Sequence, residues 1–579
     1  MIRLFRFLKP YRIPIALVFV LIFLQSLSDL YLPTLMANIV DTGIVKGDTS
    51  YILRIGSFML VVAIGGTICA VAGNFYAARV AIGFGRLVRG KLFTHVERFS
   101  LHEFDQVGTA SLITRTTNDT TQVQLVLAIM LRMMISAPLM GIGGIIMAVS
   151  QDAQLAWVLI AAVPVLALAI YIIMAKSIPL FQAVQVKLDK LNLVLDEGLA
   201  GVRVIRAFDR IDHEKRRFDE ANHDLMDVSI SVNRIVATLM PVMMLVLNLA
   251  TIAIVWFGGI RINNGEMQIG ALIAFLQYAM QILFALLMLS MMFIMLPRAS
   301  ASAKRINEVL DVKPEIKDAE VLDDTDTERG YVEFKDVTFS YPGAEEPALC
   351  DISFSARPGE VTAIIGGTGS GKTTLVSLIP RLYDVDPAVA SGRILVDGVD
   401  IRTMSQEHLR SKIGFVPQKA VLFSGTITEN IHYGKADASE LEIRHAADVA
   451  QATEFISEMT DGFDSLIAQG GTNVSGGQKQ RLSIARALVR RPEIYIFDDS
   501  FSALDFKSDS KLRAALKKET LDATVLIVAQ RVSTVMDADQ IIVLDEGRIA
   551  GIGTHRELMG TSEVYREIVS SQLSLEEIA

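Results

Sequence analysis

The chain has 579 residues, enough for several domains, and it is too apolar for a purely soluble enzyme, with 51% hydrophobic residues and a mean hydropathy of +0.41. The composition therefore implies a part embedded in a membrane. A net charge of −9 leaves no basic excess for nucleic acid, which disfavours a helicase or a DNA translocase. The two cysteines, Cys69 and Cys350, support no disulfide framework, metal cluster or thiol chemistry.

Residues 1–10 place Arg and Lys between large apolar side chains, as a short helix lying in the membrane surface would. The apolar stretch that follows, residues 13–40, is longer than the core of a signal peptide, and no small-residue cleavage site comes after it. A signal peptide is therefore disfavoured, and we predict an uncleaved first transmembrane helix.

Further apolar stretches each reach about the 20 residues that a membrane-crossing helix needs. The six predicted spans are residues 13–40, 55–78, 127–149, 155–175, 235–260 and 271–296, within a transmembrane domain of residues 1–310. Basic residues gather before the first span and after the second and fourth. The positive-inside tendency therefore places the N-terminus and the C-terminal half of the chain in the cytoplasm.

The two connections on that side, residues 80–126 and 176–234, are long, charged and poor in Gly and Pro. Unstructured loops of that length are rare, so we expect the helices themselves to continue beyond the bilayer. Their turns, near residues 104–111 and before Gly201, are the expected contact regions for whatever lies below the membrane.

One acidic residue lies within a predicted span. Asp29 shares a helix face with Gln25 and lies roughly 25 Å along the helix from Ile13, near the outer edge of the apolar core. It either contacts substrate or an outer gate, or it caps or pairs at the outer interface with a purely structural role.

In the sixth span, glutamine, phenylalanine and methionine side chains recur at spacings of four and three residues, which places them on one helix face. The members of this stripe are Gln277, Gln281, Phe284, Met288, Met291 and Met295. Methionine and aromatic surfaces adapt to varied apolar ligands, so the stripe would suit a permissive substrate cavity. Packing between helices or contact with lipid explains the same pattern.

The chain becomes charged after Pro297, and residues 311–330 form an acidic linker of poor periodicity. Residues 331–579 have the composition of an α/β domain that is large enough for its own core.

A glycine-rich motif follows the apolar run at residues 361–365. Gly366 is followed by four residues and then by Gly371-Lys372-Thr373, the G-x-x-x-x-G-K-[ST] pattern of a phosphate-binding loop. The loop points N–H groups and a helix N-terminus at one anion, Lys372 reaches the terminal phosphates, and the Thr373 hydroxyl binds Mg²⁺. A glycine-rich turn that matches by chance is the alternative. Further along, Ile494-Tyr-Ile-Phe ends in Asp498, the pattern of a buried strand whose carboxylate holds Mg²⁺ through its water shell.

Between these two elements lies Ser475-Gly476-Gly477-Gln478, ahead of a helix-like run. This sequence resembles the signature of ATP-binding cassette (ABC) proteins. Other cassette elements stand at fitting positions: Tyr341 as a base-stacking aromatic, Gln418 after Phe415-Val-Pro, and Ser502-Ala-Leu-Asp505 with the D-loop aspartate. Six spans followed by one cassette is similar to half-transporters of the exporter type, and the resemblance covers essentially the whole chain.

The resemblance implies that ATP and Mg²⁺ are the cofactors and that two cassettes work as a head-to-tail pair. ATP on the phosphate loop of one subunit would be completed by the signature of the other. Gln418 would join Thr373 and Asp498 at Mg²⁺ and link the nucleotide to movement of the membrane half. The residues expected to contact nucleotide or its Mg²⁺ are Tyr341, Gly366, Thr368, Gly369, Ser370, Gly371, Lys372, Thr373, Thr374, Gln418 and Asp498.

Two positions depart from the family pattern. Asp499 stands where a glutamate usually positions the attacking water. One methylene fewer retracts the carboxylate by roughly an ångström, and misplacement on that scale can cost about 10²-fold in rate. Gln530 stands where a histidine usually contacts the terminal phosphate, and an amide can hydrogen-bond but cannot become cationic.

Both departures fall at the chemical step, beside an intact phosphate loop and signature. The pattern resembles the degenerate subunit of a bacterial heterodimeric ABC multidrug exporter, which implies a different partner half-transporter with the complete glutamate and histidine. It also implies export of amphipathic drugs or lipids across the bacterial cytoplasmic membrane, with membrane lipid and a small-molecule substrate as partners and no nucleic acid. A slow homodimer, an exporter of one peptide or cofactor, and a nucleotide-gated channel or regulator remain as alternatives.

Overall fold

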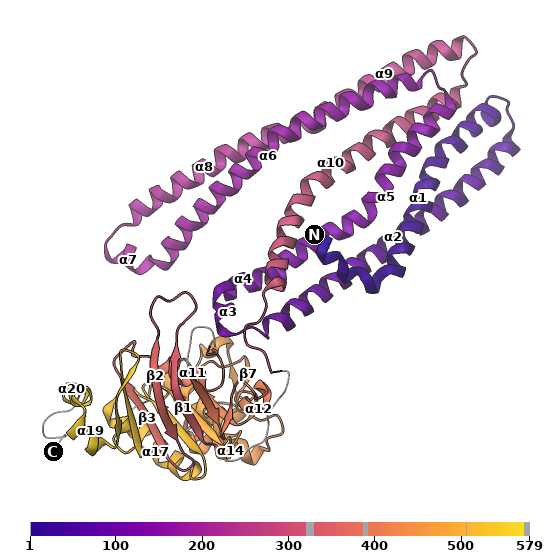
Figure 1. The fold of residues 1–579 in the computed structure, drawn as a ribbon. Helices are drawn as coiled ribbons and strands as arrows, with labels where there is room; N and C mark the ends of the chain where they lie inside the picture. The colour runs from indigo at the N-terminus through magenta and orange to yellow at the C-terminus, as the bar shows by residue number, and fades with distance from the viewer. Residues whose placement is uncertain (1, 320–328, 386–391, 505, 573–579) are drawn as a thin grey trace. The chain divides into compact units, whose positions relative to one another are not determined.

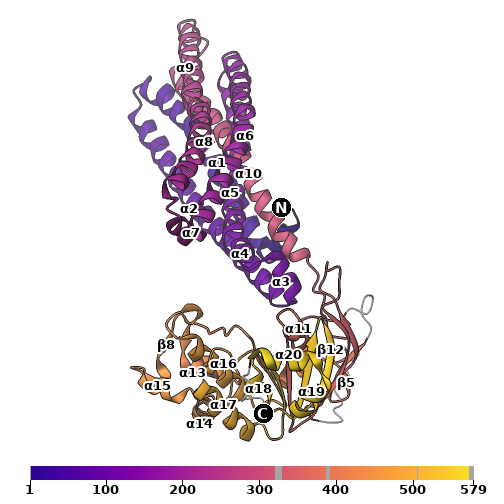
Figure 2. The same ribbon diagram turned by 90° about the vertical axis from the view of Figure 1, so that its left-hand side faces the viewer.

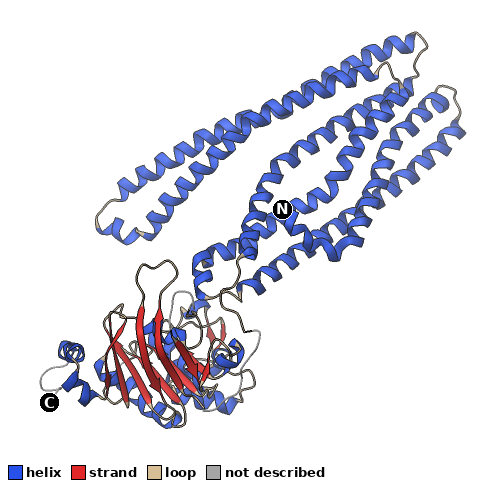
Figure 3. Cartoon of the chain, viewed as in Figure 1, coloured by secondary structure: helices blue, strands red, loops and turns tan. Residues whose placement is uncertain are grey.

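The structure of the chain, a computed structural model, describes residues 2–319, 329–385, 392–504 and 506–572 (Figure 1). It divides into two compact units, one of Met1–Glu97 with Gly108–Val312 and one of Arg98–Val107 with Lys313–Ala579. The described part of the first unit is helical, and the described strands all lie in the second (Figure 3).

Long helices make up most of the first unit. They are α1 (Arg12–Asn38), α2 (Thr49–Val96), α5 (Thr120–Gln151), α6 (Ala156–Ala200), α8 (Ile211–Ala237), α9 (Leu239–Asn263) and α10 (Ile269–Asp311). Shorter helical segments precede or join them: η1 (Ile2–Tyr11) before α1, and η2 (Ile39–Ile44), α4 (Thr109–Thr114), η3 (Arg115–Asp119) and α7 (Val202–Ala207) between long helices. In the described part of the chain, 6 helical stretches are long and apolar enough to cross a membrane, as the sequence predicts.

The helices continue well beyond their apolar segments. Helix α2 has 48 residues, which at 1.5 Å per residue gives about 70 Å, more than twice the roughly 30 Å of a bilayer core. Helix α6 likewise has 45 residues and runs beside α8 and α9 (Figure 1). The predicted helical extensions are therefore present, and α7 fills the turn between α6 and α8.

Helix α10 packs along α5 and α1, and a buried tyrosine fixes its place. The hydroxyl of Tyr278, a fully buried residue, donates to the Leu30 carbonyl oxygen at 2.9 Å and lies 2.7 Å from the Thr34 hydroxyl. Because a buried hydroxyl needs a partner, these two contacts with α1 fix the rotation of α10. The surrounding core includes Phe275 and Ile282 of α10.

The described residues of the second unit form three sheets. The strands are β1 (Val332–Phe339), β2 (Leu349–Ala356), β3 (Val361–Gly366), β4 (Arg393–Val396), β5 (Val399–Asp400), β6 (Ile413–Val416), β7 (Gly425–Thr426), β8 (Leu466–Ile467), β9 (Ile494–Asp498), β10 (Thr524–Val528), β11 (Gln540–Asp545) and β12 (Arg548–Gly553). The six-stranded sheet has the order β12-β11-β3-β10-β9-β6 and is parallel except for β12. An antiparallel sheet β2-β1-β4-β5 and the pair β7-β8 complete the set.

The described helices of this unit lie before, between and after these strands. They are α3 (Leu101–Val107), α11 (Lys372–Leu378), α12 (Gln406–Ser411), α13 (Ile427–His432), α14 (Glu440–Val449), α15 (Thr453–Glu458), α16 (Gly476–Leu488), α17 (Phe506–Glu519), α18 (Val532–Val535), α19 (His555–Thr561) and α20 (Glu563–Gln572), with the turns η4 (Gly462–Asp464) and η5 (Gln469–Gly471). Helices α13 to α16 gather at one side of the cassette, and β5 and β12 lie at the other (Figure 2).

The six-stranded sheet separates two apolar cores, because successive side chains on a strand point to opposite faces. On β9, Tyr495 and Phe497 enter the core formed with the helices, whereas Ile494 and Ile496 enter the core formed with β1 and β2. All five residues of β9 are buried. A strand covered on both faces reads as a continuous apolar run, and its one polar residue, Asp498, stands at its carboxyl end.

Candidate functional site

The phosphate loop connects the end of β3 to the start of α11. Gly369 and Gly371 adopt φ values of +84° and +94°, a left-handed conformation that favours glycine. The Lys372 ammonium folds back over the loop and donates to the carbonyl oxygens of Gly366 at 2.9 Å and Gly367 at 2.6 Å. The loop predicted from residues 366–373 therefore has the strand–turn–helix setting that its motif requires.

The hydroxyl of Thr373 contacts the carboxylate that ends β9. Thr373 Oγ1 donates to Asp498 Oδ1 at 3.0 Å. Strands β3, β10 and β9 are neighbours in the parallel sheet, so their carboxyl ends lie at the same edge. Asp498 ends β9 and Thr373 lies just beyond the loop after β3, which brings the two residues together. A hydroxyl and a buried carboxylate side by side form an oxygen donor set of the kind that Mg²⁺ prefers.

Three loops at the same edge of the sheet bring Gln418, Asp499 and Gln530 together. Gln418 follows β6, Asp499 follows β9 and Gln530 follows β10. The Asp499 carboxylate accepts from Gln530 Nε2 at 2.9 Å and from Gln418 Nε2 at 3.3 Å, both at Oδ2. Asp499 itself has a φ of +46° and is 8% exposed. Two neutral amides therefore hold the same oxygen of a short, buried carboxylate.

Burial dominates the electrostatics of this cluster. It raises the pKa of Asp498, with repulsion from Asp499 adding to the effect and a hydrogen bond from Thr373 opposing it. Burial also raises the pKa of Asp499, against a hydrogen bond from Gln418. It lowers the pKa of Lys372, although both carboxylates favour the charged ammonium. A divalent cation beside these carboxylates would relieve their repulsion.

Tyr341 lies beside the start of α11. Its hydroxyl is 2.8 Å from the Thr374 hydroxyl, and its ring packs edge-on against Phe339 and Tyr383. The ring is 36% exposed, so one surface remains accessible to a planar ligand. The sequence did not single out Tyr383, because a lone tyrosine outside a motif gives no signal of its neighbours.

The signature sequence begins helix α16. Ser475 is the N-cap residue, and it forms a capping box with Gln478: Ser475 Oγ accepts from Gln478 N at 3.3 Å, and Gln478 Oε1 accepts from Ser475 N at 2.8 Å. A Cβ atom at Gly477 would lie 3.1 Å from the Ala503 carbonyl oxygen, tighter than usual, so glycine permits this close approach. Gly476 precedes it with open space around its Cα.

Two glutamines that sequence reasoning missed support these loops through backbone atoms. Gln480 of α16 donates to the Gln418 carbonyl oxygen at 2.8 Å. Gln572 of α20 donates to the Gln530 carbonyl oxygen at 2.8 Å and accepts from Val532 N at 2.8 Å. Gln480 lies in the helix that follows the signature, so its place in the sequence could have identified it as a residue near the site. Nothing in the local sequence marks Gln572.

In the membrane unit, two of the predicted cavity residues meet. Gln281 Nε2 donates to the Asp29 carbonyl oxygen at 3.0 Å, which links α10 to α1. Gln277, Phe284 and Met288 are exposed, on the face of α10 opposite its buried residues. Met295 is partly buried. The side chain of Met291 and the whole of Asp505 lie outside the described residues.

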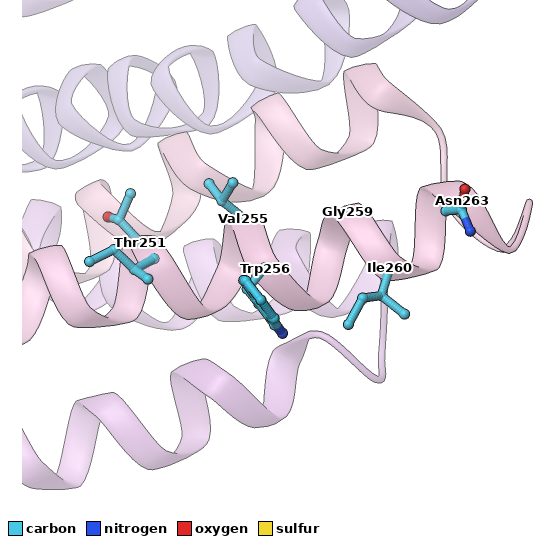
Figure 4. Close-up of a pocket in the computed structure, with 7 residues that line it drawn as sticks. Thr251, Val255, Trp256, Gly259, Ile260 and Asn263 are labelled. Atoms are coloured by element: carbon cyan, nitrogen blue, oxygen red, sulfur yellow. The ribbon is translucent and has the colours of Figure 1, made fainter.

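A concave surface lies on α9. This open hollow has a volume of about 630 Å³ (Figure 4). It is lined by Thr251, Ile252, Val255, Trp256, Gly259, Ile260 and Asn263. Trp256 is 69% exposed, and exposed tryptophan on an apolar helix suits the membrane interface. The hollow contains none of the predicted site residues.

Comparison with known proteins follows the same division of the chain. Residues 15–307 match the ABC transporter transmembrane region, and residues 349–502 match the ABC transporter model. An uncharacterized ABC transporter ATP-binding protein of Mycobacterium tuberculosis is 46% identical over 98% of this chain and 97% of its own length. The ATP-dependent lipid A-core flippase of Vibrio parahaemolyticus is 29% identical over 98% of this chain and 96% of its own length.

The solved structure of a bacterial Atm1-family ABC exporter with ATP bound is similar to this chain with a TM-score of 0.81 and 25% identity, covering 97% of this chain and 98% of the other. A multi-pass helical region joined to a cassette with a phosphate loop defines a membrane protein with an ATPase domain. The chain belongs to the ABC transporter family. It has the architecture of an ABC exporter half-transporter, which confirms the predicted fold class of six apolar helices followed by an α/β cassette.

Proposed function

We propose that this chain is one half of a heterodimeric, ATP-driven exporter, in which it supplies a hydrolysis-impaired ATP site and an intact signature for its partner's site. The observation that carries the proposal is the contact of Asp499 with Gln530 and Gln418. These three residues occupy the loops at which attacking water and terminal phosphate would meet. Asp499, at the position that would orient the water, and Gln530, at the position that would contact the terminal phosphate, both differ from the family pattern.

The altered groups weaken hydrolysis for two physical reasons. Asp499 is one methylene shorter than glutamate, and a retraction of roughly an ångström can cost about 10²-fold in rate. Gln530 Nε2 donates a hydrogen bond to Asp499, and the amide cannot take up a proton. It therefore provides no positive charge to stabilise the negative charge that develops on the terminal phosphate. Binding should be affected much less, because Lys372 and Thr373 keep the residue types and the setting of the motif.

The cluster around Asp498 fits a nucleotide with Mg²⁺. Thr373, Asp498 and Gln418 would hold the ion, and the phosphate loop with Lys372 would hold the phosphates. A bound Mg²⁺ supplies charge neutralisation at the phosphates. The fit rests on the adjacent oxygen donors of Thr373 and Asp498 and on the raised pKa of the Asp498 carboxyl.

The signature of this chain would complete the ATP site of a different half-transporter that carries the full glutamate and histidine. Ser475 caps α16 through its capping box, so the N-terminus of the helix is shaped to meet a phosphate from a partner. The faster hydrolysis would therefore take place on nucleotide held by the partner.

For substrate, we propose amphipathic small molecules, drugs or lipids, moved outward across a bacterial cytoplasmic membrane with the N-terminus and cassette inside. Exposure of Gln277, Phe284 and Met288 on α10 supports a soft apolar surface with a polar end. The name of the Vibrio relative, a lipid A-core flippase, is consistent with a lipid-like substrate class.

The test is purification of the full chain alone and together with the half-transporter that co-purifies from its native membrane. Alone, the chain should hydrolyse ATP slowly while still binding it, and the pair should hydrolyse ATP briskly and accumulate ethidium in inside-out vesicles. Brisk hydrolysis by the chain alone would overturn the proposal of a heterodimer with one impaired site. ATP-gated currents without accumulation would instead favour a nucleotide-gated channel.

A further inference from the structure

The chain passes between its two compact units at three places: between Glu97 and Arg98, between Val107 and Gly108, and between Val312 and Lys313. Helix α3 lies between the first two crossings, and the linker to the cassette begins at the third. Both α3 and the start of the linker belong to the second unit. Any force that passes through the covalent chain from one unit to the other passes through these two segments.

A single carboxylate connects these two segments. Glu103 of α3 accepts from the linker nitrogen Glu315 N at 2.7 Å through Oε1, and from Ser100 N at 2.5 Å through Oε2. The next linker residue, Ile316, is 7% exposed. The His102 ring nitrogen also lies 4.0 Å from the Glu315 carboxylate. Glu103 therefore holds its own helix start with one oxygen and the linker backbone with the other.

Burial distinguishes Glu103 from three glutamates that cap helices α13, α14 and α19. Glu429, Glu442 and Glu557 each accept from the N-cap nitrogen of their own helix, and each is exposed or partly exposed. Glu103 is only 3% exposed. A buried carboxylate is costly unless both of its oxygens are hydrogen-bonded. Capping the helix uses one oxygen of Glu103, and the N–H of the linker provides the hydrogen bond to the other.

We propose that Glu103 is a positioning residue that fastens the linker to α3, so that the three crossings move as one junction when the cassette changes conformation. Glu103 acts through the backbone nitrogen of Glu315 and touches no nucleotide. Loss of this bond would leave each cassette able to bind nucleotide but would weaken the response of the membrane helices to it. The inference goes beyond the proposed function, since it requires neither a particular substrate nor unequal ATP sites.

The test uses the full chain in its native complex, with Cys69→Ser and Cys350→Ser and a reporter cysteine, Phe284→Cys, on the exposed face of α10. The rate of reaction of this cysteine with N-ethylmaleimide is measured with and without Mg²⁺ and AMP-PNP, so that no transported substrate is needed. The variants are Glu103→Ala, Glu315→Pro and their combination. Glu315→Ala is the matched control, because it removes the side chain but keeps the N–H that Glu103 accepts, whereas proline removes the N–H.

We expect the nucleotide-dependent change in labelling rate to fall by at least about fivefold in Glu103→Ala and in Glu315→Pro, with no further fall in the combination. Glu315→Ala should respond like the parent, and nucleotide binding should be unchanged in all variants. Equal responses in Glu315→Pro and Glu315→Ala would overturn the proposal, and so would losses that multiply in the combination. Because the readout is labelling, it is independent of whether the complex transports anything.

A second measurement keeps the test decisive if Glu103→Ala folds poorly. His102→Cys with Glu315→Cys, in a chain that carries Cys69→Ser and Cys350→Ser but not the reporter cysteine, should be joined rapidly by a short bifunctional thiol reagent, because the native side chains at these positions approach within 4.0 Å. Adding Glu103→Met, which keeps a side chain of similar length but removes both acceptor oxygens, should slow that reaction. An unchanged rate would mean that Glu103 does not hold the linker.

Discussion

The phosphate side of the cassette site comprises residues 366–373 with Asp498, and the hydrolytic side comprises Gln418, Asp499 and Gln530. On the phosphate side, the loop, the lysine and the Thr373–Asp498 contact all have the form that phosphate and Mg²⁺ binding requires. On the hydrolytic side, two amides and a short carboxylate contact one another. On the function proposed above, the difference means that one cassette keeps the residues for holding ATP while the residues for hydrolysing it are altered.

The largest expected effect comes from comparing substitutions in two parts of this chain that contact nucleotide: the signature, which completes the partner's site, and the phosphate loop, which belongs to the chain's own site. Ser475→Arg should lower the ATPase rate of the complex by more than about tenfold, because it removes the N-cap of α16 and blocks the partner's site. Lys372→Ala should lower it only about twofold, since it affects the slow site. Rates of Mg²⁺-dependent phosphate release by the purified complex are the measurement.

Ser475→Thr is the control, because threonine can also cap a helix. Equal losses from Lys372→Ala and Ser475→Arg would mean that both sites turn over alike, as in a homodimer. The comparison between the two sides of the site would then carry no functional meaning.

Asp499→Glu combined with Gln530→His should raise turnover at the slow site by about tenfold or more. The longer carboxylate regains roughly an ångström of reach, and the histidine restores a group that can be cationic. The measurement is made in the Ser475→Arg background, so that phosphate release reports the slow site alone. Because Gln530 donates to Asp499, the two single variants should not add up to the double variant.

Asp498→Asn should stabilise the chain in the absence of Mg²⁺ and remove most of the stabilisation that Mg²⁺ with AMP-PNP provides. Burial raises the pKa of Asp498, so the charged form costs stability, and asparagine still accepts from Thr373. We expect a melting temperature higher by about 2–4 °C at neutral pH, the shift that roughly 1 kcal/mol produces in a domain of this size.

The sign of the pH dependence checks the cause. A raised folded-state pKa means that the cost is fully present above that raised value and disappears as the pH falls below the ordinary aspartate value of 3.8. The advantage of Asp498→Asn should therefore shrink on acidification in thermal melts without Mg²⁺. An advantage that stays constant with pH would point to packing and not to charge.

The sequence was sufficient for features that depend on neighbouring residues. The phosphate loop is eight consecutive residues, and the membrane helices show as runs of apolar side chains. It was insufficient where loops distant in the chain meet. Gln572 reaches the Gln530 backbone across 42 positions, and Glu103 reaches Glu315 across 212, through bonds to main-chain atoms that nearly every residue type offers, with proline lacking the N–H. Patterns of side chains do not record which backbone atoms they will contact.

The smallest expected effect lies entirely on the binding side of the site. Tyr341→Phe keeps the ring but removes the hydroxyl that contacts Thr374, so the affinity for nucleotide should fall by about two- to fivefold, the lower part of the range of a single neutral hydrogen bond. Thr374→Val should have a similar effect, and the two together should cost no more than either. Equilibrium binding of a fluorescent ATP analogue measures the affinity, and single-turnover phosphate release measures hydrolysis. If binding and hydrolysis are separate functions of the two sides, the release rate at saturating nucleotide should stay the same in all three variants. A parallel fall in that rate would mean that the position of the base also sets the geometry at Asp499, and the two sides of the site would not be independent.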